Sequence, residues 1–234
     1  MPLGLPDAIK ACLFDLDGVL TPTAKIHAAA WKKMFDDFLR DRDGDGFTPF
    51  DPSTDYNRYV DGKPRYDGVR SFLQSRDIPA GDDLVKQLGD RKNDLVVKIV
   101  KEDGVDPYKG SLRYLHAVRD AGLRTAVVSA SANCLDVIRS AGIEDLLEVR
   151  VDGAVAKERD LKGKPAPDTF LEAARELGVA AEQAAVFEDA LAGVEAGRAG
   201  SFGIVVGVDR VDHAEDLKAH GADVVVQDLA ELLA

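Results

Sequence analysis

The stretch Ala11-Cys12-Leu13-Phe14-Asp15-Leu16-Asp17-Gly18 decides how the rest of the chain is organised. Four apolar residues lead directly into an acidic turn, which is typical of a strand buried in a parallel sheet. Asp15 and Asp17 would then stand at the carboxyl end of the strand, where open α/β sheets bind their ligands. Two neighbouring carboxylates repel one another unless a cation or a shared proton relieves them. By itself, this stretch leaves a functional site and a solvated strand end equally open.

The composition is that of an ordinary globular protein with one large domain, or with a core domain and an insertion. The chain has 234 residues, of which 45% are hydrophobic and 31% charged. Its net charge of −12 argues against nucleic acid or an anionic membrane as a partner. No apolar run is long enough to span a membrane, and the first residues lack the pattern of a signal peptide. Since Cys12 and Cys134 form no metal-binding spacing, we expect reduced thiols and a cytoplasmic protein.

Strand and helix patterns alternate along the second half of the chain. Apolar segments that read as buried strands cover residues 123–129, 146–151, 184–187, 202–208 and 223–226. Helical patterns lie between them, and glycines stand where several of these helices should end. Alternation of this kind predicts an α/β fold with a doubly wound parallel sheet and helices on both faces.

The segment between the first strand and this region reads as helical, with patterns over residues 24–40, 69–76 and 81–101. We therefore predict an α-helical domain, residues 23–101, inserted into a core domain made of residues 1–22 and 102–234. His27 and Trp31 lie one turn apart on the first predicted helix. They could reach a site beside Asp15 or pack in the core.

An acidic segment within the inserted domain looks at first like a calcium-binding loop. Residues 41–46 have acidic side chains and a glycine at the expected places, but Pro52 stands where a bidentate glutamate is required. We reject a calcium site here and predict a polar surface loop over residues 41–55. Residues 56–68 read as a compact, basic, turn-rich element.

Acids or a hydroxyl stand at the polar ends of the predicted strands. They are Asp15 and Asp17, Ser129, and Glu188 and Asp189. Lys164 precedes a predicted helix that begins with prolines. In a doubly wound sheet these ends converge at one edge. Clustered carboxylates suit a hard cation such as Mg²⁺, and a hydroxyl and a lysine beside it could hold phosphoryl oxygens. The set predicts phosphoryl transfer to an aspartate.

In order and spacing, these residues resemble the four motifs of the haloacid dehalogenase-like phosphotransferase superfamily. The helical insertion resembles the cap domain of that superfamily, so the resemblance covers the whole chain. Within the superfamily, the chain looks most like the β-phosphoglucomutase family. Further segments carry this closer resemblance: His27 and Trp31, and residues 62–65, 91–94, 129–133 and 163–168.

The resemblance implies a role for each matching residue at the strand ends. Asp15 would be the nucleophile that becomes phosphorylated, and Asp17 would be the general acid and base. Mg²⁺ would be held by the Asp15 carboxylate, the Asp17 backbone carbonyl and Asp189, with Glu188 close by.

The resemblance also implies a set of substrate contacts. Ser129 and Lys164 would hold the phosphoryl group that is transferred, and Arg65, Ser131 and Asn133 would hold a second phosphate. The remaining implied contacts are His27, Trp31, Gly62, Lys63 and Lys92 in the cap and Ala130 in the core.

The function that the resemblance implies is a Mg²⁺-dependent mutase that converts β-glucose 1-phosphate into glucose 6-phosphate through glucose 1,6-bisphosphate. A sugar-phosphate phosphatase, with the same nucleophile and a cap that admits water, is the second candidate. A non-catalytic binding protein is the third, and it is poorly supported because every catalytic position holds a competent residue. The expected partner is a small phosphorylated sugar, and the expected state is a monomer.

Overall fold

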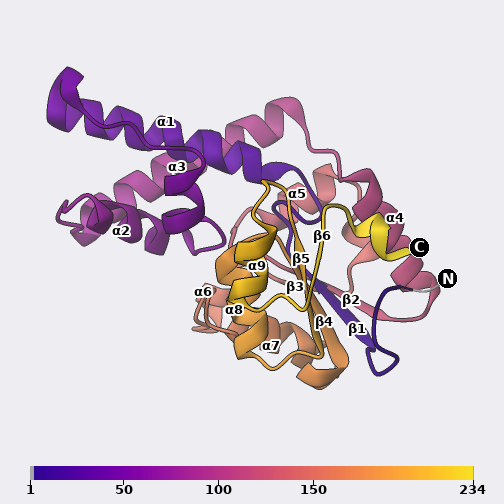
Figure 1. Ribbon diagram of the computed structural model, residues 1–234. Coiled ribbons are helices and arrows are strands. Elements are labelled where there is room, and N and C mark those ends of the chain that lie inside the picture. The colour runs from indigo at the N-terminus through magenta and orange to yellow at the C-terminus, as the bar shows by residue number, and fades with distance from the viewer. Residues whose placement is uncertain (1–2, 234) are drawn as a thin grey trace.

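The computed structural model describes residues 3–233 and contains a six-stranded parallel sheet (Figure 1). The strands are β1 (Ala11–Phe14), β2 (Arg124–Val128), β3 (Val149–Val151), β4 (Ala184–Glu188), β5 (Ile204–Val208) and β6 (Val224–Val226). Their order is β3-β2-β1-β4-β5-β6, so the chain winds outward in both directions from β1. The predicted doubly wound sheet is confirmed, and the point where the winding reverses lies between β1 and β4. Residues 1, 2 and 234, at the ends of the predicted core domain, lie outside the described residues.

Helices cover both faces of the sheet. They are α4 (Lys109–Asp120), α5 (Cys134–Ser140), α6 (Gly153–Glu158), α7 (Asp168–Glu176), α8 (Leu191–Ala199) and α9 (Ala214–His220). Alternate residues of β1 enter opposite layers: Phe14 packs on one face with Phe187 of β4, and Leu13 packs on the other with Phe170 of α7. Burial sets which face each side chain occupies, and the parallel pairing of β1 with β2 and β4 sets the edge at which its acidic end emerges.

A separate group of helices lies to one side of the sheet (Figure 1). It contains α1 (Thr23–Asp43), α2 (Arg65–Ser75) and α3 (Asp82–Asp103), which pack around an apolar cluster of their own. The predicted helical insertion is present, while its exact boundaries, 23 and 101, remain a prediction. Between residues 3 and 233, no helix is long and apolar enough to cross a membrane.

Several element boundaries differ from the prediction. Helix α1 continues to Asp43, α2 begins at Arg65 instead of residue 69, and α7 begins at Asp168, after the two prolines rather than at them. Helix α6 was not predicted at all. It is six residues long, too short to show an apolar period, and it begins where Asp152 accepts hydrogen bonds from the backbone N–H groups of residues 154 and 155.

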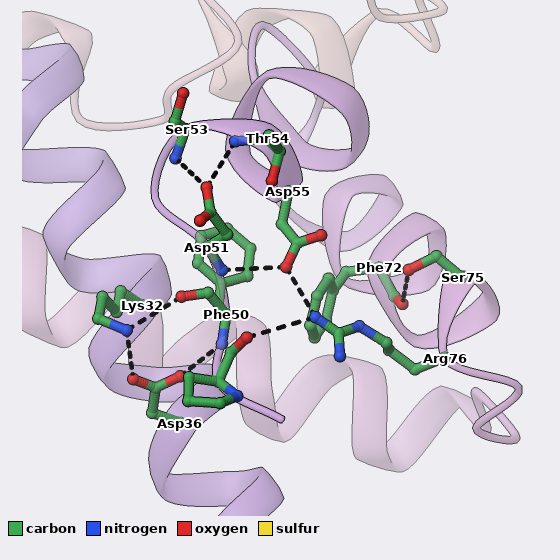
Figure 2. A network of polar contacts seen from close by, with 11 residues as sticks. Lys32, Asp36, Phe50, Asp51, Ser53, Thr54, Asp55, Phe72, Ser75 and Arg76 are labelled. Carbon is green, nitrogen blue, oxygen red and sulfur yellow. Dashed lines mark hydrogen bonds and ion pairs between the residues drawn. The ribbon is translucent and has the colours of Figure 1, made fainter. Parts of the chain in front are cut away.

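The prediction of a polar surface loop over residues 41–55 is wrong at its centre. Phe50 is fully buried, with its ring 5.3 Å from that of Phe35 and 5.1 Å from that of Phe72. Figure 2 shows the polar contacts that hold the loop around it, including Phe50 N–H donating to Asp36 and the ion pair of Asp55 with Arg76. The loop is therefore part of the cap core, and it leads directly into a π-helical turn, Tyr56–Val60.

Replacing Phe50 with alanine is expected to lower the free energy of unfolding by about 3–5 kcal/mol, because it empties a site between two other rings. Urea unfolding followed by circular dichroism measures the loss. Phe47→Ala is the matched control, because Phe47 belongs to the same loop but is only half-buried. Equal losses in the two variants would show that Phe50 does not anchor the loop.

Candidate active site

The predicted strand-end acids meet at the carboxyl edge of the sheet, where the winding reverses. Asp15 follows β1 and donates its backbone N–H to Phe187 O of β4 at 2.9 Å, so the two strands run side by side into the site. Oxygens of Asp15, Glu188 and Asp189 lie within 4.8 Å of one another, and all three residues are buried. The predicted convergence of β1 and β4 at one acidic cluster is therefore confirmed.

Lys164 enters this cluster from the segment before α7. Its buried ammonium pairs with Asp15 Oδ1, lies 2.5 Å from Glu188 Oε1 and donates to the Val128 carbonyl at 3.2 Å. Burial alone would lower the pKa of Lys164, but the charges of Asp15 and Glu188 outweigh burial and hold that pKa above its usual range. The lysine is therefore a fixed positive charge beside Asp15.

The acidic cluster has the chemistry of a divalent-cation site. One ammonium faces three buried carboxylates, and burial, together with the neighbouring acids, raises the pKa of Asp15 and of Asp189 well above the usual range. Glu188 is completely buried, and its Oε1 faces the same Lys164 ammonium that pairs with Asp15. Oxygen donors of this kind fit a hard cation, whose charge would relieve the repulsion among them.

The turn after β1, which contains Asp17 and Gly18, lies directly against this cluster. Gly18 adopts φ +92° and donates its N–H to Thr21 O at 2.7 Å. A Cβ at Gly18 would lie 1.7 Å from an Asp189 carboxylate oxygen, so the turn approaches the cluster as closely as only glycine permits. Arg210, which follows β5, supports the turn from behind by donating to Gly18 O at 2.8 Å.

The Asp17 carboxylate receives contacts from both the core and the cap. Thr23, in the first turn of α1, donates its hydroxyl to Oδ1, and the Ser129 hydroxyl lies 3.4 Å from Oδ2. His27 Nε2 of α1 lies 3.4 Å from Oδ1. Asp17 therefore lies at the junction between the sheet and the helical insertion, rather than in the buried cluster with Asp15.

The other ring nitrogen of His27 contacts Lys92, a buried lysine of α3. Lys92 Nζ lies 2.7 Å from His27 Nδ1. The pKa of His27 is lowered to about 4, chiefly by burial and then by the charge of Lys92, against the opposing effect of Asp17. Burial likewise lowers the pKa of Lys92 to about 7. A neutral His27 that accepts from Lys92 and directs its Nε2–H toward Asp17 fits this arrangement.

Trp31 packs one turn further along α1. It is only 3% exposed, belongs to the apolar cluster of the cap, and lies with its ring centre 4.8 Å from Lys92 Nζ. Of the two possibilities that the sequence leaves open for Trp31, the structure favours core packing, while His27 reaches the site.

The cap and the core touch at several points around the cluster. Asn133 Nδ2, before α5, donates to Asn93 Oδ1 of α3 at 2.9 Å. Gly62 faces Ala190, and a Cβ added to Gly163 would lie 2.1 Å from Pro64 Cγ. The loop that contains Gly62 therefore packs against the segments that carry Asp189 and Lys164, and the structure is in a closed form.

Two basic residues near the start of α2, Lys63 and Arg65, have partners within the cap. The Arg65 guanidinium lies over the Tyr66 ring at 5.0 Å. Lys63 instead donates to Ser71 Oγ at 3.2 Å, within the cap. Both contacts lie within the cap, so the roles of Arg65 and Lys63 in substrate binding stay predictions.

The loop after β2 is folded tightly beside Asp17. Ser129 Oγ accepts from the Ser131 N–H at 3.0 Å, and Ser131 Oγ accepts from the Asn133 N–H at 3.2 Å. A Cβ added to Gly153 would lie 2.6 Å from the Ala130 carbonyl, so this loop also packs closely against the start of α6. These contacts place the predicted core contacts, Ser129 to Asn133, on one rim of the site.

The sequence analysis assigns no role to four residues near the site, although Asn93 belongs to the segment 91–94 that carries the resemblance. They are Thr23, Asp61, Asn93 and Arg210. Asp61 alone carries a visible signal, because it is an acid within a segment that reads as basic. The other three are ordinary polar residues whose importance depends on contacts far away in the sequence.

Comparisons with known proteins agree with this site. A family model of haloacid dehalogenase-like hydrolases matches residues 9–200. A β-phosphoglucomutase of Mycobacterium tuberculosis is 54% identical over 99% of this chain and 94% of its own, and one of Bacillus subtilis is 32% identical over 96% and 92%. The crystal structure of a β-phosphoglucomutase from Clostridium difficile superposes with a TM-score of 0.79 at 28% identity, over 96% of this chain and 93% of that one. The chain therefore belongs to the haloacid dehalogenase-like hydrolase family, as a relative of its β-phosphoglucomutases.

Proposed function

We propose that this enzyme is a Mg²⁺-dependent phosphomutase that converts β-glucose 1-phosphate into glucose 6-phosphate. The reaction would pass through glucose 1,6-bisphosphate and a phosphorylated Asp15. The observation that carries the proposal is the 54% identity to a β-phosphoglucomutase over nearly the whole chain. The buried pair of Asp15 and Lys164 and the adjacent Asp17 supply the groups that the reaction needs.

Asp15 and Asp17 divide the chemistry between them. A carboxylate oxygen of Asp15 attacks the phosphorus, the bond from phosphorus to the sugar oxygen breaks, and Asp17 gives that oxygen a proton. In the other half-reaction, a sugar hydroxyl attacks the phosphorus of phosphorylated Asp15 and loses its proton to Asp17, and the Asp15 carboxylate is released. The bisphosphate must reorient in the site between the two half-reactions, so that each of its two phosphates is next to Asp15 once.

The remaining core residues would hold the groups in place. The Asp15 and Asp189 carboxylates and the Asp17 carbonyl are the proposed Mg²⁺ ligands, with Glu188 close by, and the cation would neutralise charge on the phosphoryl group. Lys164 and Ser129 would bind oxygens of the same group. Lys164 is suited to this because it is already charged and buried beside Asp15.

The cap would decide whether water or a sugar receives the phosphoryl group. An aspartyl phosphate is open to hydrolysis unless water is excluded, and closure of a lid over the site does this. In the closed form described here, the Asp15 side chain is only 8% exposed. We propose residues 23–101 as this lid, with His27 and Lys92 helping to close it over Asp17.

One assay separates the mutase from the phosphatase. The enzyme is given β-glucose 1-phosphate, Mg²⁺ and a trace of glucose 1,6-bisphosphate, and glucose 6-phosphate and free phosphate are followed together. Glucose 6-phosphate should form with little phosphate release. Phosphate release without glucose 6-phosphate would exclude the mutase and establish the hydrolase.

Arg65→Ala is expected to lower kcat/KM for the mutase roughly ten- to hundredfold, because a bisphosphate needs a cation away from Asp15 and loses hydrogen bonds to a charged partner. Hydrolysis of a small ester such as p-nitrophenyl phosphate, which has no second phosphate, should change far less. Arg70→Ala is the matched control, since Arg70 lies on the same helix and pairs with Asp82 at 2.8 Å. Equal losses on both substrates would remove Arg65 from the second phosphate site.

A further inference from the structure

Arg210 contacts the turn that carries Asp17, although it lies almost 200 residues later in the chain. It follows β5, and its side chain is only 17% exposed. Its Nε donates to the Gly18 carbonyl at 2.8 Å, and its Nη1 donates to the carbonyl of Gln227, directly after β6, at 2.7 Å. A guanidinium presents its N–H groups in a rigid planar fork, so one side chain can bind carbonyls of two separate segments. Arg210 therefore links the Asp17 turn to the far strands of the sheet.

The guanidinium of Arg210 is itself held in place. It lies over the Tyr108 ring, 3.8 Å from the ring centre, and its Nη1 lies 3.8 Å from Asp228 Oδ2. Tyr108 in turn donates its backbone N–H to Leu20 O at 2.9 Å. Leu20 and Tyr108 belong to the two segments that connect the sheet with α1 and α3. Arg210 thus lies where both connections to the cap meet the core.

The turn needs such a contact because its conformation depends on a glycine. Glycine has the widest choice of backbone angles, and Gly18 adopts φ +92°. Its N–H donates to Thr21 O at 2.7 Å, and its carbonyl accepts from Arg210. The peptide groups on both sides of Gly18 are therefore held. The first of them contains the Asp17 carbonyl, so these bonds also fix the backbone from which the Asp17 side chain extends.

The two neighbouring carbonyls of the turn are bound by the core as well. Val19 O accepts from the buried Ser111 hydroxyl at 2.6 Å, and Leu20 O accepts from the Tyr108 N–H. Among the donors to these three consecutive carbonyls, Arg210 is the charged one, and hydrogen bonds from a charged donor are roughly twice as strong as neutral ones. The core thus holds the backbone of the turn, while α1 contacts the Asp17 carboxylate through Thr23.

We propose that Arg210 is a positioning residue for phosphoryl transfer, which acts through Gly18 on Asp17. The inference rests on the proposed function of Asp17, the exchange of protons with the sugar. Proton transfer requires hydrogen-bond distance between Asp17 and the reacting oxygen, and a misplacement of about 1 Å can slow a reaction about 10²-fold. Arg210 keeps the turn where Asp17 reaches that oxygen.

Rapid quenching with two phosphoryl donors tests this role. Glucose 1,6-bisphosphate should phosphorylate Arg210→Ala roughly ten- to hundredfold more slowly than the wild type, because the leaving sugar oxygen needs a proton from Asp17. Acetyl phosphate, whose leaving group needs no proton, should react at close to the wild-type rate. Asp228→Asn is the matched control, because it removes a charge beside the same guanidinium and leaves the bond to Gly18 in place. This control should react as the wild type does with both donors.

A double-mutant cycle separates positioning of Asp17 from a merely structural role. In the Asp17→Asn background, Arg210→Ala should cost little further rate with the bisphosphate, since the group through which Arg210 acts is already lost. A general loss of structure would instead lower the rate by the same factor in both backgrounds. Circular dichroism shows whether each variant is folded. If Arg210→Ala is not, Arg210→Lys takes its place with the same expected selectivity, because lysine keeps the charge but lacks the fork for two carbonyls.

The outcomes distinguish this inference from the proposed function. A wild type that neither donor phosphorylates would overturn both. If Asp17→Asn discriminates between the donors and Arg210→Ala does not, the role of Arg210 alone is overturned. Independent, multiplicative losses in the double-mutant cycle would overturn it as well.

Discussion

Replacing Asp15 with asparagine is expected to abolish both glucose 6-phosphate formation and phosphate release, by a factor on the order of 10⁵ or more, because the nucleophile itself is removed. An amide has almost the same shape as the carboxylate, so Lys164 and the cluster keep their places, but it cannot form the aspartyl phosphate. The paired assay for glucose 6-phosphate and free phosphate measures both losses at once. Asp67→Asn, which makes the same change on the cap surface, should leave both products unchanged.

Loss of folding is not expected to explain the inactivity of Asp15→Asn. The pKa of Asp15 in the folded protein lies above its unfolded value, so its ionised form lowers stability as pH rises from the unfolded pKa through the folded one. The asparagine removes this penalty, and Lys164 keeps Glu188 as its partner. Without added cation, the variant should melt at or above the wild-type temperature at neutral pH. Activity that survived in a folded variant would refute Asp15 as the nucleophile.

The acidic core of the site was accessible from the sequence because its information is local. An apolar run of four residues predicts β1, the turn after it places Asp15 and Asp17 at a strand end, and a similar run places Glu188 and Asp189 after β4. Strand ends of a doubly wound sheet converge by topology. No knowledge of side-chain packing is needed to expect these acids at one edge.

The cap contacts were not accessible in the same way. Phe50 stands among polar residues, and only the neighbouring rings of Phe35 and Phe72 explain its burial. Asp61 acquires its environment from Glu188 and Asp189, more than 120 residues later in the chain. Contacts of this kind depend on how the cap sits on the core, which neither periodicity nor turn chemistry encodes.

The strand-end acids and the cap contacts also differ in the part of the reaction that they would serve. The locally predictable residues Asp15, Glu188 and Asp189 belong to chemistry that a mutase and a phosphatase would share. His27, which belongs to the cap, lies beside Asp17, the group proposed to exchange protons with the sugar, and Lys92 contacts the other side of the His27 ring. The choice between water and sugar therefore depends on the part of the structure that the sequence predicts least well.

Asp17→Asn is expected to slow the mutase about 10²- to 10⁴-fold, because an amide can neither protonate the leaving sugar oxygen nor accept the proton of the attacking hydroxyl. Asparagine can still accept the hydrogen bond that Thr23 donates, so the turn after β1 should keep its shape. Because Asp15 keeps its carboxylate, the variant should lose proton transfer but retain the nucleophile. The variant should still become phosphorylated by acetyl phosphate, whose leaving group needs no proton.

The comparison of two phosphoryl donors therefore isolates proton transfer at Asp17. Rapid quenching should show phosphorylation of Asp17→Asn by acetyl phosphate at close to the wild-type rate, but slow phosphorylation by glucose 1,6-bisphosphate. The phosphorylated variant should also persist, because transfer to a sugar hydroxyl needs the missing base. If both donors instead lost reactivity equally, Asp17 would act by holding Asp15 and the cation in place, and the proton would have to travel through another group.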